Sequence, residues 1–320
     1  MRISVAICTH NRAGILAETL NSFQALNLSE PADVELLIVD NKSSDETRDV
    51  VHRFMPGSRI ASRYIFEENL GLSNARNRAI REATGEVIAF VDDDVYFDRN
   101  WLIEILRAFR QFPDAMCLSG AVLPHYENGR PEWLDPDPDW LNMEAMFSIT
   151  LFGDSARYLE PHETPVGANF ALRVEALRAL GGFSGALGRH GKVLLSKEES
   201  ELFFRINRSG QRGASAPLAI VHHRISPERA TQRWLLRRFY WQGISQVVFE
   251  QLTAPKNRLD LLMSCVRDVR RMVAVLLGGS WSPIRLYWHV RSYHFYHRAF
   301  AAYTLAVIRK RVSLALLGGR

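Results

Sequence analysis

The first half of the chain alternates short apolar runs with segments of helical periodicity. The apolar runs have the length and composition of buried strands and span residues 3–8, 34–39, 64–66, 87–91 and 115–122. The helical segments between them span residues 13–26, 45–54, 73–83 and 101–112. Because parallel strands need a crossover connection, usually a helix, this alternation constrains the fold more than any other feature of the sequence. It predicts an α/β fold with a Rossmann-like, mainly parallel sheet and helices on both of its faces.

The second half of the chain is less regular. Residues 131–140 are rich in proline and tryptophan, which predicts an irregular loop. The elements expected beyond this loop are strands at 166–172 and 217–221 and helices at 174–180 and 198–209. After about Arg224 the sequence becomes helical and basic. We therefore expect a first domain over residues 1–229 and a basic, aromatic-rich helical region over residues 230–320.

The composition excludes several classes of protein. With 320 residues, 47% of them hydrophobic, the chain can bury a large core and does not have the composition of a disordered protein. Its three cysteines, Cys8, Cys117 and Cys265, are too few and too scattered for a disulfide framework or a zinc site. The N-terminus enters a strand pattern without the apolar segment of a secretory signal. We therefore expect a cytoplasmic protein.

Positive charge is concentrated in the last third of the chain. Arg224 to Arg320 contain 17 Lys and Arg against four Asp and Glu, whereas the preceding residues contain 23 against 31. The basic residues are interleaved with aromatic ones: Trp281, Tyr287, Trp288, Tyr293, Phe295, Tyr296, Phe300 and Tyr303. The longest apolar runs there, 272–279 and 299–308, are shorter than the roughly 20 residues that a membrane-spanning helix needs.

This mixture of charges and aromatic residues predicts helices that lie on the anionic inner surface of a membrane. A nucleic-acid partner is not expected. The alternative is a helical cap that packs on the first domain and exposes its arginines to water.

Three consecutive carboxylates, Asp92, Asp93 and Asp94, follow directly on the apolar run 87–91. Adjacent carboxylates repel one another and raise one another's pKa unless a positive charge shares the site. Carboxylate oxygens suit Mg²⁺ or Mn²⁺, and these ions keep coordination positions open for substrate phosphates. The triplet therefore predicts a site for a nucleoside diphosphate. The alternative is an acidic turn in water.

The other strands of the predicted sheet also end in polar segments. In an open α/β sheet, ligands bind outside the carboxyl ends of the strands. The segments at these ends are 9–12, 40–45, 68–73 and the Asp triplet. Asp40 can accept hydrogen bonds from a base or ribose, and Arg76 can meet a base or a phosphate or be a surface charge. A dinucleotide-binding dehydrogenase is disfavoured, because residues 9–14 contain a single glycine instead of Gly-x-Gly-x-x-Gly.

Four of these segments together are recognisable. Residues 5–12, 37–45, 69–77 and 90–94 resemble, in order and spacing, the family 2 glycosyltransferases with the GT-A fold. The resemblance extends from about residue 3 to residue 230. It implies an inverting transfer of a sugar from a nucleotide-sugar donor, with Mg²⁺ or Mn²⁺ on the diphosphate. A uridine diphosphate sugar is favoured because it is the commonest donor among such proteins.

The resemblance also implies roles for individual residues. Those on the donor side are Thr9, Asn11, Arg12, Asp40, Asn69, Gly71, Arg76, Asp92 and Asp93, with Asp40 on the base and Asp93 near the ribose. The metal would be held by Asp94 and Asp92, with His223 favoured over His222 as a further ligand. Gly167, Asn169 and Glu198 would lie on the acceptor side. Glu199 falls where the family has an aspartate that acts as the catalytic base.

The chemistry requires such a base whatever the family. Inversion in one displacement needs a carboxylate that takes the proton of the acceptor hydroxyl as its oxygen attacks the anomeric carbon. The expected acceptor is a glycan or a lipid-linked sugar in the assembly of a cell-surface polysaccharide or glycolipid. One alternative is a non-catalytic nucleotide-sugar-binding module, which Glu in place of Asp at position 199 favours. The other is a sugar nucleotidyltransferase, which would need a Gly-rich phosphate loop that residues 9–14 lack.

Overall fold

The structure is a computed structural model that describes residues 1–29, 33–134, 144–191, 193–278 and 290–317. The chain divides into two compact units. Unit 1 comprises Met1–His125, Phe147–Gly191 and Glu198–Arg224. Unit 2 comprises Tyr126–Met146, Lys192–Lys197 and Ile225–Arg320.

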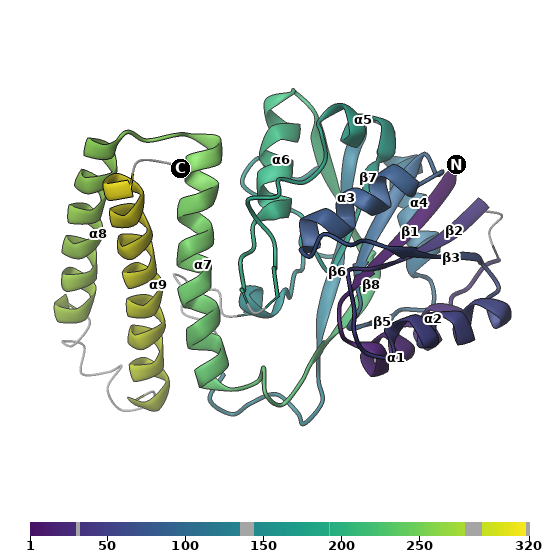
Figure 1. Ribbon diagram of the computed structural model, residues 1–320, viewed down its shortest axis with the longest axis horizontal. Helices are drawn as coiled ribbons and strands as arrows, with labels where there is room; N and C mark the ends of the chain where they lie inside the picture. The colour runs from purple at the N-terminus through teal and green to yellow at the C-terminus, as the bar shows by residue number, and fades with distance from the viewer. Residues whose placement is uncertain (30–32, 135–143, 192, 279–289, 318–320) are drawn as a thin grey trace. The chain divides into compact units, whose positions relative to one another are not determined.

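Unit 1 is built on an eight-stranded sheet with the strand order β3-β2-β1-β4-β7-β6-β8-β5 (Figure 1). Its parallel part consists of β1 (Arg2–Thr9), β2 (Asp33–Asp40), β3 (Ala61–Phe66) and β4 (Val87–Asp92). The remaining strands are β5 (Val95–Phe97), β6 (Ala115–Tyr126), β7 (Asn169–Arg173) and β8 (Arg212–Ile225). β7 runs antiparallel to β4 and β6, and β5 runs antiparallel to β8.

Helices cover both faces of this sheet, as the strand sequences require. Alternate residues of one strand enter two different cores, so that Ile3, Val5 and Ile7 of β1 lie in one core and Ala6 lies in the other. The first core also contains apolar residues of α1 (Ala13–Gln24), α2 (Thr47–Phe54) and α4 (Trp101–Gln111). The second contains those of α3 (Leu72–Glu82), α5 (Val174–Ala179) and α6 (Glu198–Arg208). The predicted α/β fold class is therefore confirmed.

Several elements of unit 1 differ from the prediction. β3 begins at Ala61 instead of residue 64, β6 continues to Tyr126 instead of residue 122, and β7 begins at Asn169 instead of residue 166. β5 was not predicted, because a strand of three residues leaves no periodic pattern in the sequence. β8 spans 14 residues instead of the predicted 217–221, because its half-buried polar residues continue the ladder beyond the apolar run. The described part of the chain also has two short 3-10 turns, Met55–Gly57 and Glu144–Phe147.

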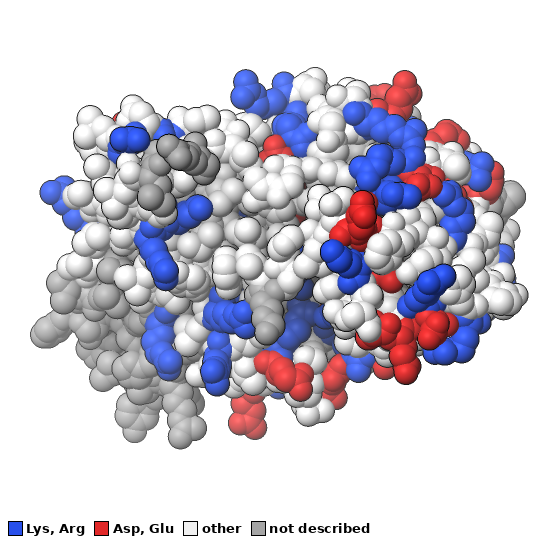
Figure 2. All heavy atoms as spheres, in the orientation of Figure 1, with Lys and Arg blue, Asp and Glu red and all other residues white. Residues whose placement is uncertain are grey.

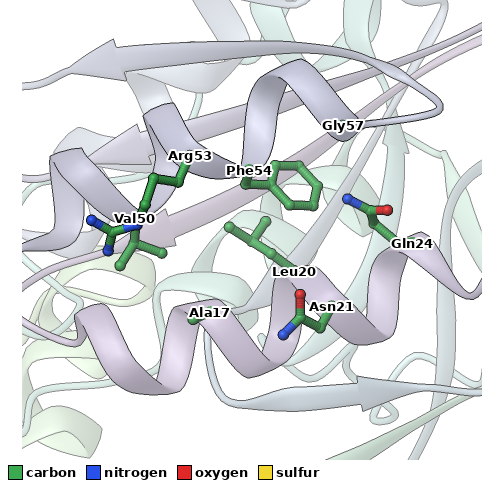
Figure 3. A pocket seen from close by; sticks show the side chains of 8 residues that line it. All are labelled: Ala17, Leu20, Asn21, Gln24, Val50, Arg53, Phe54 and Gly57. Atoms are coloured by element: carbon green, nitrogen blue, oxygen red, sulfur yellow. The ribbon is translucent and has the colours of Figure 1, made fainter.

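A small cavity of about 290 Å³ lies between α1 and α2 (Figure 3). Its lining residues are Ala17, Leu20, Asn21, Gln24, Val50, Arg53, Phe54 and Gly57. None of the predicted site residues is among them, so this cavity is separate from the candidate site.

Unit 2 contains three long helices, α7 (Gln232–Thr253), α8 (Arg258–Gly278) and α9 (Val290–Leu317) (Figure 1). α9 packs against both α7 and α8. Gly243 allows the close approach of α7 to α9, because a Cβ atom there would lie 2.4 Å from the carbonyl oxygen of Tyr303. Arg311 of α9 is buried and forms ion pairs with Glu250 of α7, at 2.8 Å, and with Asp268 of α8. One guanidinium thus links all three helices.

The predicted helical character of the C-terminal region is confirmed. Among the described residues, no helix combines the length and the apolar character that crossing a bilayer requires. Trp281, Tyr287 and Trp288 lie outside the described residues, as does the greater part of the predicted loop at 131–140.

Candidate functional site

The carboxyl ends of the parallel strands bring the predicted polar segments to one edge of the sheet. In the strand register, Thr9 of β1 pairs with Asp40 of β2, and Cys8 of β1 pairs with Asp92 of β4. Parallel pairing in register therefore places the ends of three strands side by side. This edge is the candidate site.

The middle carboxylate of the Asp triplet is held by the chain after β1. The Thr9 hydroxyl donates to Asp93 Oδ2 at 2.7 Å, and Arg12 Nη1 contacts Asp93 Oδ1 at 2.5 Å. Arg12 Nη1 also lies 3.0 Å from Asp94 Oδ2. These two carboxylates raise the pKa of Arg12, which keeps the guanidinium charged. Thr9 and Arg12 thus position the triplet, and Asp93 is buried beneath them.

The two outer carboxylates meet a histidine from β8. Asp92, Asp94 and His223 each offer one ligand atom, and these atoms lie within 4.8 Å of one another. Asp94 Oδ1 is 3.2 Å from His223 Nε2, and both residues are buried. His222 pairs with Tyr96 of β5 and is not part of this cluster. Of the two histidines, the structure therefore brings His223 to the Asp triplet.

The residues of this cluster fit a divalent cation. Burial and the neighbouring charge of Asp94 raise the pKa of Asp92 to about 6, against the opposing effect of Arg76. A bound cation would relieve this repulsion between carboxylates. Two carboxylates suit Mg²⁺ or Mn²⁺, and the imidazole is a nitrogen ligand that Mn²⁺ accepts more readily than Mg²⁺ does.

Arg76 of α3 lies between the metal-ligand cluster and a pair of glutamates. Its guanidinium is buried against the rings of Phe90, Phe170 and Phe183, with centroid distances of 5.3–6.0 Å. The charged contacts of the guanidinium are Nη2 to Asp92 Oδ1 at 3.7 Å, Nη1 to Glu198 Oε1 at 3.1 Å and Nη1 to Glu199 Oε1 at 2.8 Å. The guanidinium is therefore occupied by carboxylates, whereas the prediction gave Arg76 a direct contact with a base or a phosphate. The side chain instead links Asp92 to Glu199.

Glu198 and Glu199 begin α6 and have different surroundings. The side chain of Glu198 is 3% exposed and that of Glu199 is 14% exposed. Burial and the charge of Glu199 raise the pKa of Glu198 to about 8, against the opposing effect of Arg76. Within the described part of the chain, Glu198 Oε2 is buried without a hydrogen-bond partner. Because burial and a neighbouring carboxylate disfavour its charged form, Glu198 retains a proton more readily than a carboxyl group in water does.

Of the residues predicted on the acceptor side, Gly167 lies at the site. Its carbonyl oxygen accepts from Arg76 Nη2 at 3.1 Å. A Cβ atom on Gly167 would lie only 1.8 Å from Glu199 Oε1, so a glycine is required beside this carboxylate.

The prediction for Asn169 is not supported, because its amide is buried and fully used. Asn169 Oδ1 accepts from Trp101 Nε1 at 2.9 Å, and Nδ2 donates to the carbonyls of Ala121 and Ala219 at 2.9 and 2.7 Å. The side chain therefore joins the strands to α4. Its amide oxygen and nitrogen are both engaged in these contacts and do not face an acceptor sugar.

The loops after β2 and β3 carry the other predicted donor residues. Asp40 is buried and accepts hydrogen bonds from the Ser43 amide at 2.8 Å and from the Tyr64 hydroxyl at 2.7 Å. Burial and the contact with Asp40 raise the pKa of Tyr64. Asn11 Oδ1 accepts from the Ser44 amide at 2.7 Å, which joins the loop after β1 to the loop after β2.

Asn41 holds the third loop, although sequence reasoning gave it no role. Its Oδ1 accepts from the Gly71 amide at 2.7 Å, and its Nδ2 donates to the Asn69 carbonyl at 2.8 Å. The signal was its position directly after Asp40, where a short polar side chain at a strand end reaches the next loop. Gly71 has φ +135°, which explains the glycine at the N-cap of α3. The Asn41 side chain thus holds the backbone of Asn69 and Gly71, and the donor-side role of these two residues stays a prediction.

The sequence also matches known proteins. The profile of the family described as "Glycosyl transferase family 2" matches residues 4–181. The glucosyl-dolichyl phosphate glucuronosyltransferase of Haloferax volcanii is 28% identical over 277 residues, which cover 84% of this chain and 85% of that protein. The succinoglycan biosynthesis protein ExoM of Rhizobium meliloti is 28% identical over 252 residues, which cover 76% of this chain and 73% of that protein.

Solved structures share the fold. The mannosyltransferase PcManGT of Pyrobaculum calidifontis, in complex with GDP-Man and Mn²⁺, superposes with a TM-score of 0.62 at 20% identity, over 97% of this chain and 86% of that one. GalNAc-T7 with UDP, GalNAc and Mn²⁺ superposes with a TM-score of 0.55 at 17% identity, over 78% of this chain and 51% of that one. These likenesses agree with the fold that the sequence resemblance implied.

Proposed function

Because the chain belongs to glycosyl transferase family 2, we propose that it is a metal-dependent, inverting glycosyltransferase that uses a nucleoside diphosphate sugar, with UDP favoured as the nucleotide. One observation carries this proposal. The same Arg76 guanidinium contacts Asp92 of the candidate metal site and Glu199, the candidate base. A donor diphosphate at the first carboxylate and an acceptor hydroxyl at the second would therefore be neighbours.

On the donor side, Asp40 would accept hydrogen bonds from the base, and Asp93, positioned by Thr9 and Arg12, would lie near the ribose. Asp92, Asp94 and His223 would hold Mn²⁺ or Mg²⁺. When bound, the ion neutralises charge on the diphosphate and makes it a better leaving group.

On the acceptor side, Glu199 would take the proton of the attacking hydroxyl. A bond forms between the acceptor oxygen and the anomeric carbon as the bond from that carbon to the diphosphate breaks on the opposite face, and the proton passes to Glu199. With a proton on Glu198, the positive charge of Arg76 would act mainly on Glu199, which its Nη1 contacts at 2.8 Å. The two carboxylates then have separate roles because their environments differ.

The acceptor is proposed to be a glycan or a lipid-linked sugar. The names of the two relatives specify a dolichyl-phosphate-linked glucose and a polysaccharide, respectively. We propose that residues 1–229 form the catalytic domain and that residues 230–320 hold it at the cytoplasmic face of a membrane. The product would then enter a cell-surface polysaccharide or glycolipid.

A thermal-shift screen tests this function without knowledge of the acceptor. Nucleoside diphosphates are added with and without Mn²⁺, because a ligand that binds the folded state raises the melting temperature according to its occupancy. We expect UDP to raise the melting temperature only when Mn²⁺ is present. Stabilisation by UDP to the same extent in EDTA would contradict the metal assignment, and no stabilisation by any nucleoside diphosphate would contradict the donor class.

A further inference from the structure

Helix α8 exposes the more apolar of its two sides. Its large exposed residues have 42–66% of their surface accessible and are Leu259, Leu262, Met263, Val266, Val269 and Val273. Their spacing of three, four and seven residues places them on one face of the helix, which we call the outer face of α8. The opposite side buries Leu261, Ser264 and Cys265 and directs Asp268 to Arg311. A helix selected only to pack in a protein core would be oriented the other way.

Basic residues border this face. At the helical advance of about 100° per residue, Arg258 and Arg267 fall at its two edges and Arg270 falls within it. All three are exposed. The surface over α8 and α9 in Figure 2 shows blue side chains among white ones and few red ones. Long arginine side chains beside an apolar stripe can reach phosphate groups while their stems cover apolar surface.

We propose that the outer face of α8 rests on the surface of an anionic lipid bilayer, with its apolar side chains among the acyl chains and its arginines among the headgroups. This deepens, and rests on, the membrane location in the proposed function, because it names the face that makes the contact. A helix with an apolar face and a basic border has the properties of an interfacial helix that lies in the membrane plane. Among the described residues no helix has the character of a span, which agrees with contact in the plane.

A second copy of the chain fits this face less well. A two-fold contact would bring the same basic patch of both copies together, so that Arg258, Arg267 and Arg270 would face a surface with the same positive charges, and like charges repel. The stripe runs from Leu259 to Val273, roughly 21 Å of helix at about 1.5 Å per residue. A stable interface buries about 1,200 Å² or more, which is a large area for one helical stripe of this length paired with itself. Charge and area therefore favour lipid.

Flotation of the full-length protein with vesicles tests the proposal. One set of vesicles is phosphatidylcholine and the other is phosphatidylcholine mixed with phosphatidylglycerol. We expect the wild type to float with the mixed vesicles and to be released in part by high salt, because screening weakens attraction between surface charges. Leu262→Glu combined with Val266→Glu should reduce the bound fraction about tenfold or more, since two charges would enter the acyl region. Leu218→Glu is the matched control, because Leu218 is 59% exposed but belongs to unit 1.

A second variant separates charge from apolar contact. Arg267→Gln combined with Arg270→Gln should remove most of the preference for the mixed vesicles. Metal-dependent UDP binding, measured on the same samples, should be unchanged in both double variants, which shows that they are folded and that the donor site is independent of this face.

Two results would overturn the proposal while the transferase function stands. In one, the wild type binds UDP with Mn²⁺ but ignores both kinds of vesicle, or the Leu262/Val266 variant floats as well as the wild type. In the other, light scattering shows a wild-type dimer without vesicles that the Leu262/Val266 variant converts to a monomer. The second result would assign the outer face of α8 to a second copy of the chain.

Discussion

Unit 1 buries charged side chains at the end of its sheet, whereas unit 2 exposes apolar side chains along α8. Asp93, Asp94, His223, Arg76 and Glu198 are all buried. Leu259, Met263 and Val266 of α8 have more than half of their surface exposed. Soluble proteins ordinarily do the reverse in both places.

Each arrangement costs free energy in the protein alone. A buried charge is unfavourable unless it is paired and hydrogen-bonded, and an exposed apolar stripe loses the benefit of burial. In unit 1 three carboxylates share one guanidinium, because Arg76 contacts Asp92, Glu198 and Glu199. In unit 2, large apolar side chains of α8 are left exposed to water. The difference gives each unit its own proposed partner, a divalent cation for the buried carboxylates of unit 1 and a lipid surface for the exposed apolar face of α8 in unit 2.

The largest expected effect is at the metal-ligand cluster. Asp94→Asn keeps the size of the side chain but removes the charge that the cation requires, so Mn²⁺-dependent binding of UDP should be abolished in calorimetry. Sugar transfer should fall by about 10³-fold or more, because one carboxylate of the metal site is lost. Asp98→Asn is the control, since Asp98 follows β5 and is not part of the cluster. Full affinity of Asp94→Asn for UDP in Mn²⁺ would show that the buried carboxylates of unit 1 do not bind a cation.

A smaller effect is expected at Arg76. Arg76→Lys retains the charge but cannot make the forked contacts with Asp92, Glu199 and the Gly167 carbonyl. Transfer should fall by about 10- to 100-fold as the base loses its position, whereas Mn²⁺-dependent UDP binding should change by only a few-fold. Arg205→Lys, on the same helix as Glu199 and paired with Glu201, should have little effect on transfer. Equal losses of UDP binding and transfer in Arg76→Lys would return Arg76 to the donor site.

A third effect, on stability and not on activity, is a pH dependence that comes from Glu198. Its pKa is raised from 4.5 to about 8 in the folded protein, so the folded state binds a proton that the unfolded state releases between these values. Stability should therefore fall as the pH rises from about 4.5 to about 8, by on the order of a few kcal/mol. Melting temperatures across this range should decline less steeply in Glu198→Gln than in the wild type. Parallel curves for the two proteins would mean that Glu198 is ionised throughout, and Glu201→Gln serves as the control.

The features that could be predicted from the sequence are those that depend on hydrophobic periodicity and on the positions of the strand ends. The nearly continuous apolar runs at 3–8 and 87–91 were enough to expect a sheet that is covered on both faces. The parallel register then brought Thr9, Asp40 and Asp92 to one edge, because the carboxyl ends of parallel strands coincide.

The sequence could not predict what depends on tertiary neighbours. Arg76 and Asn169 are polar residues in motif positions. The side-chain hydrogen-bond partners of Arg76 lie at least 91 residues away along the chain, and those of Asn169 at least 48 residues away. Whether such a side chain faces a ligand or satisfies a buried carbonyl is decided by these distant groups. The helix predicted at 73–83 begins at Leu72, and the Ser73 hydroxyl donates to the Leu187 carbonyl at 2.8 Å.

The most direct test of the transferase site compares Glu199→Gln with the wild type in two measurements on the same preparation. One is calorimetric binding of UDP with Mn²⁺, and the other is release of UDP from a bound UDP-sugar in the presence of membrane glycolipids as acceptors. The amide keeps the shape of the side chain but cannot take a proton. We expect binding to stay within a few-fold and transfer to fall by about 10²- to 10⁴-fold, the usual contribution of a positioned general base. Glu201→Gln should transfer at nearly the wild-type rate. Equal turnover by Glu199→Gln and the wild type would contradict the assignment of Glu199 as the base.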